Sequence, residues 1–252
     1  MKVVLAIPCY NCSAQVSRVC REIETRWETW NIEEVWFVDN RSTDSTLETV
    51  LSFRGTSRYH EKIKILQNAL NYGLGGTHKV VFQRALQERL DAVVILHGDD
   101  QADPADIFRL ITLSVETKTT ILGSRFMPGA VLSGYQKIRI FGNLALNLLF
   151  TIVTRRKTWD LGSGLNLFLV KDLARIPFVN FSDSFNFNVD LLLAFYRNKI
   201  DLTYIPIHWR ESDQTSNARN VSVALRMLRS LGTWVTHSEA TQPGRPYHST
   251  DL

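Results

Sequence analysis

The segment His97-Gly98-Asp99-Asp100-Gln101 gathers polar side chains directly after an apolar run, which makes it the first candidate for chemistry. Hard divalent cations prefer oxygen ligands, and a glycine such as Gly98 lets the backbone approach a ligand closely. A cation held here would neutralise and orient a leaving diphosphate. The alternative is a polar turn before a helix that begins at Pro104, with Asp103 as its cap. The local spacing leaves both interpretations open.

Two other patterns suggest chemistry that the sequence then argues against. The loop Asn71–Gly76 is glycine-rich, but a dinucleotide-binding fingerprint would need Gly or Ala where His78 stands. Cys9 and Cys12 lie between a strand and a helix, as in thioredoxin-like proteins, but those domains are usually less than half as long as this chain. Three cysteines do not form a disulfide framework. We therefore expect a reduced, cytoplasmic protein.

The elements that must position these residues alternate between strand and helix. Continuous apolar runs predict buried strands at Lys2–Ile7, Val35–Val38, Lys62–Leu66 and Ala92–Leu96. Helical patterns follow the first three runs: Ser13–Trp30, a helix capped by Thr43 or Asp44, and a helix through Leu90. The alternation predicts one α/β domain over residues 1–237, with a mostly parallel, Rossmann-like sheet and helices on both faces. Residues 238–252 lose apolar periodicity, which predicts a disordered tail.

Carboxylates follow two of the predicted strands. Asp39 comes after the second strand and Asp99 after the fourth. Ligands of open α/β sheets bind beyond the carboxyl ends of the strands. We therefore expect the two carboxylates to converge on one crevice.

The stretch Ile138–Val153 predicts a helix with one narrow polar stripe, made by Arg139, Asn143, Asn147 and Thr151. Either the stripe faces solvent on a core helix, or it faces an anionic ligand while the apolar faces meet core and lipid. The apolar run Phe141–Val153 has 13 residues, whereas a bilayer span needs roughly 20, so we expect no transmembrane helix.

The segment from Arg125 to Lys157 has six basic residues and no acidic one. These positive charges either form a solvated basic face or attract phosphate and anionic membrane surfaces. Aromatic residues do not alternate with the basic ones as stacking platforms would, so we expect no nucleic-acid partner.

Together these features resemble the family 2 glycosyltransferases of the GT-A fold, and within them the dolichyl- and polyprenyl-phosphate sugar synthases. The resemblance runs from residue 3 to about residue 220, and it rests on the order and spacing of motifs that are weak singly. The matching motifs are Ile7-Pro8-Cys9-Tyr10-Asn11, Val38-Asp39-Asn40-Arg41-Ser42-Thr43-Asp44 (the family's VDDGSTD), Asn71-x-Gly73-x-Gly75, His97–Gln101 at the place of the DxDxQ metal motif, Gly123-Ser124-Arg125, Asp160-x-Gly162-Ser163-Gly164, Phe187-Asn188-Val189-Asp190-Leu191 and Ile205-Pro206-Ile207.

The resemblance implies a role for the matched residues. A divalent cation, Mg²⁺ or Mn²⁺, would be held by Asp99 with help from Gln101 and His97. The base of a nucleoside-diphosphate (NDP) sugar would lie against the loop after the first strand and Asp39. The implied substrate-binding residues are Pro8, Tyr10, Asn11, Asp39, Arg139, Asn143, Ser163 and Arg210, and the implied catalytic residues are Asp99, Arg125 and Asp190.

Three positions depart from the family's pattern. His97 replaces the first metal-motif Asp, and imidazole suits manganese better than magnesium. Arg41 replaces the Gly of VDDGS, which points to an altered base or ribose edge. The segment 209–219 lacks the Gly and Lys of the R-x-x-G-x-S-K motif, and Arg210 or Arg219 is the candidate substitute.

The expected activity is an inverting sugar transfer from an NDP-sugar to a polyprenyl-phosphate or other membrane-linked acceptor, with peripheral contact to an anionic membrane at its cytoplasmic face. A phosphate acceptor needs no base, and Arg125 and Arg139 would hold it. The alternative acceptor is a sugar hydroxyl of a glycan or small molecule, for which Asp190 would be the base unless it serves helix packing. A non-catalytic NDP-sugar-binding protein and a nucleotidyltransferase are the minor alternatives.

Overall fold

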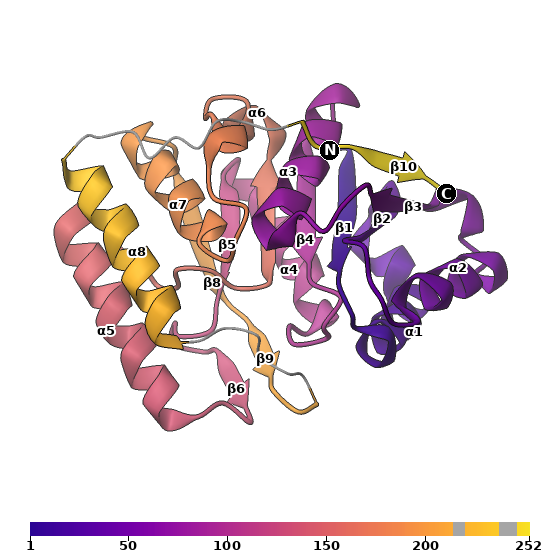
Figure 1. Cartoon of the computed structure of the whole chain (residues 1–252), viewed down its shortest axis with the longest axis horizontal. Helices are drawn as coiled ribbons and strands as arrows, with labels where there is room; N and C mark the ends of the chain where they lie inside the picture. The colour runs from indigo at the N-terminus through magenta and orange to yellow at the C-terminus, as the bar shows by residue number, and fades with distance from the viewer. Residues whose placement is uncertain (214–219, 237–245) are drawn as a thin grey trace.

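An eight-stranded sheet runs through the centre of the chain in the order β10-β3-β2-β1-β4-β7-β5-β8 (Figure 1). The computed structural model describes residues 1–213, 220–236 and 246–252. The sheet strands are β1 Val3–Cys9, β2 Glu34–Asp39, β3 Ile63–Asn68, β4 Ala92–Leu96, β5 Thr120–Ser124, β7 Leu165–Leu169, β8 Leu202–Pro206 and β10 Ser249–Asp251. β7 runs antiparallel between β4 and β5, and β10 runs antiparallel to β3, whereas the other neighbours are parallel. The predicted mostly parallel sheet is confirmed.

Helices cover both faces of this sheet, as predicted. They are α1 Ser13–Trp30, α2 Thr46–Thr56, α3 Gly73–Gln87, α4 Ile107–Thr117, α5 Lys137–Thr154, α6 Val170–Leu173, α7 Phe187–Arg197 and α8 Asn220–Val235. Two short parallel strands, β6 Val131–Ser133 and β9 His208–Arg210, pair outside the main sheet. Each face has its own core, one with α1, α2 and α4 and the other with α3, α6 and α7.

The sequence of β1 shows why the sheet is buried on both sides. Val3, Leu5 and Ile7 join the core under α1, whereas Val4 and Ala6 join the core under α3. Successive side chains of a strand point to opposite faces, so a strand covered on both faces must be apolar throughout. The continuous apolar run that predicted this strand has this physical origin.

The carboxyl ends of the strands lie together. In the parallel registers Cys9 stands beside Asp39, and Asp39 stands beside Gln67. The amide of Gly98, just past β4, donates to the Pro8 carbonyl at 3.0 Å. The loops that carry Asp39 and Asp99 therefore leave the same end of the sheet, which is the geometry that the sequence predicted.

The predicted disordered tail over 238–252 is wrong for the last residues. Residues 237–245 lie outside the described part of the chain, but β10 adds to the free edge of β3. The Tyr247 hydroxyl donates to Asp183 Oδ1 at 2.6 Å and accepts from the buried Lys79 Nζ at 2.9 Å. Asp251 pairs with Arg84. A strand of three residues is too short for its periodicity to predict it from the sequence. In the fold it is stabilised because it pairs with the backbone groups at the edge of β3 and because Tyr247 and Asp251 find polar partners.

Helix α5 has an inverted amphipathic pattern. Its polar stripe faces the protein: Asn147 is buried and donates to the Trp159 carbonyl at 2.8 Å, and Thr151 accepts from the Thr158 amide at 3.0 Å. Its apolar side chains face outward, with Phe141 at 69% and Ile152 at 64% exposed. The interpretation in which the stripe faces solvent is therefore wrong.

By length and composition alone, helix α5 is long and apolar enough to cross a membrane. Its 18 residues have a mean hydropathy of 1.3, and 17% of them are buried. It packs beside α8 at one edge of the molecule (Figure 1). The expectation of no transmembrane helix rested on a 13-residue run and is not confirmed, because the helix extends to Lys137 and Thr154.

Candidate active site

The loops after β1 and β2 are joined by hydrogen bonds. The Asn11 amide donates to Ser42 Oγ at 3.0 Å, and the Thr43 amide donates to Asn11 Oδ1 at 2.8 Å. Asp39 accepts from the Ser42 amide at 3.2 Å and is fully buried. Its predicted contact with a nucleotide base is therefore covered in this structure, whereas Tyr10 in the loop after β1 is 43% exposed.

The loop 97–101 presents one half-buried carboxylate, Asp99. Its Oδ1 accepts from the Gln101 amide at 3.3 Å, which curls the loop around it. Burial raises the pKa of Asp99, and the nearby His97 opposes the shift. Gly98 is required here because a Cβ would lie 2.7 Å from the Cys9 sulfur. The predicted close approach of the backbone at this glycine is thus real, and its neighbour is the β1 loop.

His97 is engaged with a second histidine. Its Nε2 lies 3.2 Å from the Nε2 of His78, and burial lowers the pKa of both imidazoles, so both are neutral at pH 7. His78 Nδ1 has no hydrogen-bond partner among the described residues. A buried N–H without a partner is costly, so the favoured tautomer has His78 Nε2–H donating to His97 Nε2. The ligand role of His97 stays a prediction.

The described residues hold no group of three or more His, Cys, Asp or Glu side chains that could bind a metal ion. The predicted donors Asp99 and Gln101 are both half-buried at the end of β4. Magnesium-like ions are commonly bound by one or two carboxylates, with substrate phosphates and water completing the shell. The residues fit a cation that arrives with, and is shared by, a diphosphate.

Asp100 connects this loop to two distant segments. Its carboxylate is 1% exposed and accepts from Arg18 Nε of α1 at 2.5 Å and from Arg210 of β9. The Arg210 amide also donates to the Gln101 carbonyl at 2.8 Å. Arg210, predicted to bind substrate, is thus anchored on the loop that carries Asp99. The other candidate, Arg219, lies outside the described residues.

Arg125 forms a two-pronged ion pair with Asp160, with Nε to Oδ2 and Nη2 to Oδ1 both at 2.8 Å. Burial alone would lower the pKa of Arg125, but the Asp160 carboxylate outweighs it and the pKa is raised. The guanidinium carbon lies 5.1 Å from the centre of the Trp209 ring. Because its charge is neutralised, Arg125 acts in this structure as a positioning residue for the loop of Asp160.

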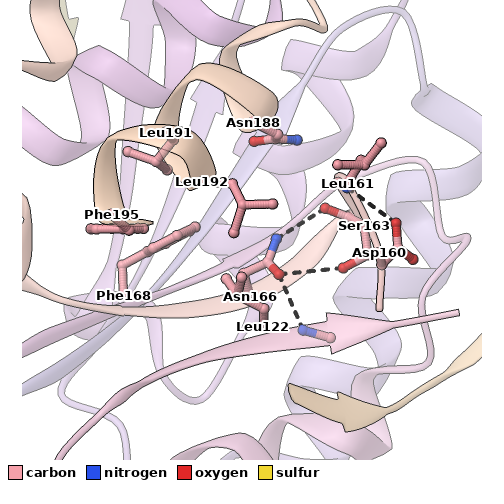
Figure 2. Close-up of a pocket in the computed structure, with 12 residues that line it drawn as sticks. Leu122, Asp160, Leu161, Ser163, Asn166, Phe168, Asn188, Leu191, Leu192 and Phe195 are labelled. Atoms are coloured by element: carbon pink, nitrogen blue, oxygen red, sulfur yellow. Dashed lines mark hydrogen bonds between the residues drawn. The ribbon is translucent and has the colours of Figure 1, made fainter. Parts of the chain in front are cut away.

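A small pocket opens beside this pair, between β5, β7 and α7 (Figure 2). Ser163 Oγ donates to the Leu165 carbonyl at 3.0 Å, and Asn166 Nδ2 donates to the Ser163 carbonyl at 3.0 Å. The polar side thus belongs to the Asp160–Ser163 loop, and Phe168 and Leu192 form part of the apolar side. Ser163 is 2% exposed, so its predicted acceptor contact is covered.

Two of the predicted substrate-binding residues, Arg139 and Asn143, lie on α5 but are paired. Arg139 forms an ion pair with Glu211 at 2.6 Å, and its guanidinium stacks 4.5 Å from the centre of the Tyr135 ring. Asn143 Nδ2 donates to the Arg139 carbonyl at 2.7 Å. Arg139 thus binds an anionic group in this structure, and that group is a carboxylate of the segment that follows β9.

Asp190 lies between α7 and α8. It accepts from Ser230 Oγ at 2.6 Å, from Asn186 Nδ2 at 2.9 Å and from the Ser182 amide at 3.2 Å. Burial raises its pKa, and these donors oppose the shift. Such a carboxylate ties helices together, so the structure favours the helix-packing alternative for Asp190.

Several contacts were not predicted from sequence: Arg18, Gln67, His78, Asp160 and Glu211 as partners of predicted residues. Asp160 belongs to a recognised motif, and because buried carboxylates are usually paired, this position could have indicated a cationic partner. The other four carry no local signal, because each partner lies on another element.

Comparisons with known proteins give one family match and several relatives. The model of a family described as Glycosyl transferase family 2 matches residues 4–175. The dolichyl-phosphate beta-glucosyltransferase of Saccharomyces cerevisiae is 26% identical over 254 residues, covering 90% of this chain and 72% of that protein. The undecaprenyl-phosphate mannosyltransferase of Micrococcus luteus is 22% identical over 214 residues, covering 84% and 85%.

Among solved structures, the chain is similar to glucosyl-3-phosphoglycerate synthase from Mycobacterium tuberculosis in complex with Mn²⁺, uridine diphosphate and glucosyl-3-phosphoglycerate. The TM-score is 0.66 at 12% identity, covering 93% of this chain and 80% of that chain. A similarity at this level of identity demonstrates a shared fold.

Proposed function

The chain belongs to glycosyl transferase family 2, and from this premise we propose that it moves a sugar from an NDP-sugar to a polyprenyl-phosphate or other membrane-linked acceptor, with inversion. The observation that carries the proposal is the common position of the Asp39 and Asp99 loops at one end of the sheet. The relatives from Saccharomyces cerevisiae and Micrococcus luteus are named as a dolichyl-phosphate and an undecaprenyl-phosphate sugar transferase.

Asp99, with Gln101, is the proposed holder of Mg²⁺ or Mn²⁺. When bound, the cation neutralises the charge that develops on the leaving diphosphate. The chain's own contribution is the fixed loop: Gly98 packs on the Cys9 sulfur, and Asp100 is clamped by Arg18 and Arg210. A preorganised carboxylate needs little rearrangement as charge develops. The Mn²⁺ in the mycobacterial synthase supports a divalent ion here.

The acceptor we favour is a phosphate monoester rather than a hydroxyl. A phosphate oxygen is already a nucleophile, whereas a hydroxyl needs a base. Asp190, the candidate base, is engaged by three donors, which supports the phosphate acceptor. Arg139 then exchanges Glu211 for the phosphate, since a guanidinium can donate to either anion and its Nη1 already contacts a carboxylate oxygen here.

The acceptor test is transfer of radiolabelled sugar to undecaprenyl or dolichyl phosphate. UDP- and GDP-sugars are supplied in turn with Mn²⁺, and 3-phosphoglycerate is offered in parallel because the fold neighbour is named for it. We expect Mn²⁺-dependent label in the organic extract. Label only on 3-phosphoglycerate would reject the lipid acceptor and leave the glycosyltransferase assignment intact.

The outward apolar side of α5 is the proposed membrane contact, placed at the cytoplasmic face of an anionic membrane. Arg155, Arg156 and Lys157 are exposed where the helix ends. Basic residues near an anionic surface each contribute about 1 kcal/mol. The helix and the residues that directly follow it thus offer apolar and cationic groups, the combination of a peripheral membrane protein.

Charge reversal of Arg155, Arg156 and Lys157 to Glu is expected to lower partitioning onto phosphatidylserine vesicles about a hundredfold, from three lost contacts of about 1 kcal/mol each. Co-sedimentation measures it. The control reverses Arg21, Arg58 and Lys62, which are exposed near α1 and α2 and carry the same total charge. Unchanged binding of the first variant, or equal loss in both, would argue against this surface.

A further inference from the structure

The loop after β2 has an arginine in a backbone conformation that favours glycine. Arg41 has φ +65°, in the left-handed region. Residues with a Cβ occupy this region at a cost, and they persist there when surrounding contacts impose it. The Arg41 side chain is exposed, so its packing does not explain why this residue is tolerated. The contacts of its guanidinium are therefore informative.

A chain of hydrogen bonds leads from Arg41 to the buried Asp39. Arg41 Nη1 donates to Gln67 Oε1 at 2.8 Å, and Gln67 Nε2 donates to Asp39 Oδ2 at 3.1 Å. A carboxylate only accepts, so Gln67 must turn its NH₂ group to Asp39 and its carbonyl to Arg41. Asp39 thus fixes the amide, and the amide fixes the guanidinium. Gln67 is half-buried and Arg41 is exposed, so a ligand at this edge meets these two residues before Asp39.

We propose that Arg41, oriented by Gln67, recognises the base of the donor nucleotide and selects bases with a carbonyl at the edge away from the ribose. This inference rests on the proposed use of an NDP-sugar. Gln67 Oε1 accepts a hydrogen bond from one N–H of Arg41. Among the described residues, Gln67 is the hydrogen-bond partner of that guanidinium. The remaining N–H groups can donate to O4 of uracil or thymine, or to O6 of guanine. Adenine and cytosine present an amino group at this edge, which donates and is rejected.

Tyr10 supplies the other half of the base site. Tyr10 follows Cys9, which stands beside Asp39 in the sheet register, and the residue is 43% exposed. An exposed ring stacks on any base, so it adds affinity without selecting among bases. The selection must come from the polar edge, which the exposed Arg41 and the half-buried Gln67 provide.

The test measures nucleotide binding directly, without acceptor or turnover. Calorimetry with UDP, GDP and ADP in the presence of Mn²⁺ compares the full chain with Arg41→Gly and Gln67→Met. We expect wild type to prefer UDP and GDP over ADP. Loss of a hydrogen bond to a charged donor should weaken UDP binding about tenfold in Arg41→Gly and leave ADP binding unchanged. Gln67→Met keeps Arg41 but removes its orienting group, so the preference should shrink there also.

The chain offers a matched control in Arg89. It is exposed, has φ +53°, and lies in the turn between α3 and β4, at the amino end of the sheet. Glycine should relieve the same backbone strain at either position, so both variants should melt at a higher temperature. Only Arg41→Gly should lose UDP affinity.

The possible failures are distinguishable. Unchanged UDP affinity in Arg41→Gly, an equal loss for UDP and ADP, or a wild-type preference for ADP would overturn the role of Arg41 while nucleotide binding stands. Absence of binding for all three nucleotides to the wild-type chain with Mn²⁺ would reject the proposed donor class and this inference together.

Discussion

Asp99→Asn is expected to lower kcat for metal-dependent release of nucleoside diphosphate by about 10²–10³-fold, the loss typical of removing one preorganised electrostatic group. Asn keeps the shape and the contact with the Gln101 amide but has no charge to hold a cation. The apparent affinity for Mn²⁺ should fall together with kcat, because Asp99 is the one carboxylate of the proposed donor set. Steady-state kinetics over a manganese titration measures both.

Asp103→Asn is the matched control for this prediction. Asp103 lies four residues further along, and its Oδ1 accepts from the Ala105 amide at 2.9 Å as a helix cap. Asn caps a helix as well as Asp does, so turnover should stay within about twofold. Full activity of Asp99→Asn would remove the metal role, and equal losses in both variants would point to disruption of the loop.

The elements around the site were predicted where one local pattern decides them. The strand Ala92–Leu96 and the helix Ser13–Trp30 have the predicted bounds, and β1 extends two residues beyond the prediction to Cys9. Burial on both faces imposes an apolar run, and that run is visible in the sequence. The direction of a strand cannot be predicted in this way. β7 is antiparallel to both of its neighbours because of the path of the chain, which its own five residues do not encode.

The family and the GT-A fold were predicted from motif order, and both are confirmed. The motifs also gave the positions of the functional loops. They did not give the pairing of the side chains: Arg125 meets Asp160, Arg139 meets Glu211, and His97 meets His78. Each pair joins separate elements, so no spacing within one element reveals it.

These pairings change what the predicted residues do. The sequence suggested that Arg125 and Arg139 bind phosphate because both are cationic. In the fold each of the two arginines is paired with a carboxylate, but the two pairs are buried to different extents. The Asp160 side chain is 1% exposed, whereas the Glu211 side chain is 19% exposed. A half-buried pair exchanges partners more readily than a buried one, since solvent shares the cost. We therefore propose Arg139 as the residue that binds an acceptor phosphate, and we expect Arg125 to support the Asp160 loop.

Loss of the Arg125–Asp160 pair should accordingly lower the stability of the fold as well as the activity. Asp160→Asn is expected to destabilise the fold by about 3 kcal/mol, because it leaves a largely buried guanidinium without its counter-charge. For a chain of this length that corresponds to a fall in melting temperature of about 6–12 °C. Thermal and urea unfolding measure this loss of stability. Asp213→Asn is the control, because it removes a carboxylate from an exposed ion pair, the one with Arg18.

A double variant separates the cost of an orphaned charge from the net value of the pair. Replacing both partners, Arg125→Met with Asp160→Leu, removes the buried charges together and should be less destabilising than Asp160→Asn alone. The Arg125 side chain also packs over Trp209, and Met retains part of that contact. If the double variant were the less stable, the hydrogen bonds to Gly162 and the Arg125 amide would carry the stabilisation instead. The support of this loop would then rest on its hydrogen bonds rather than on the pairing of charges.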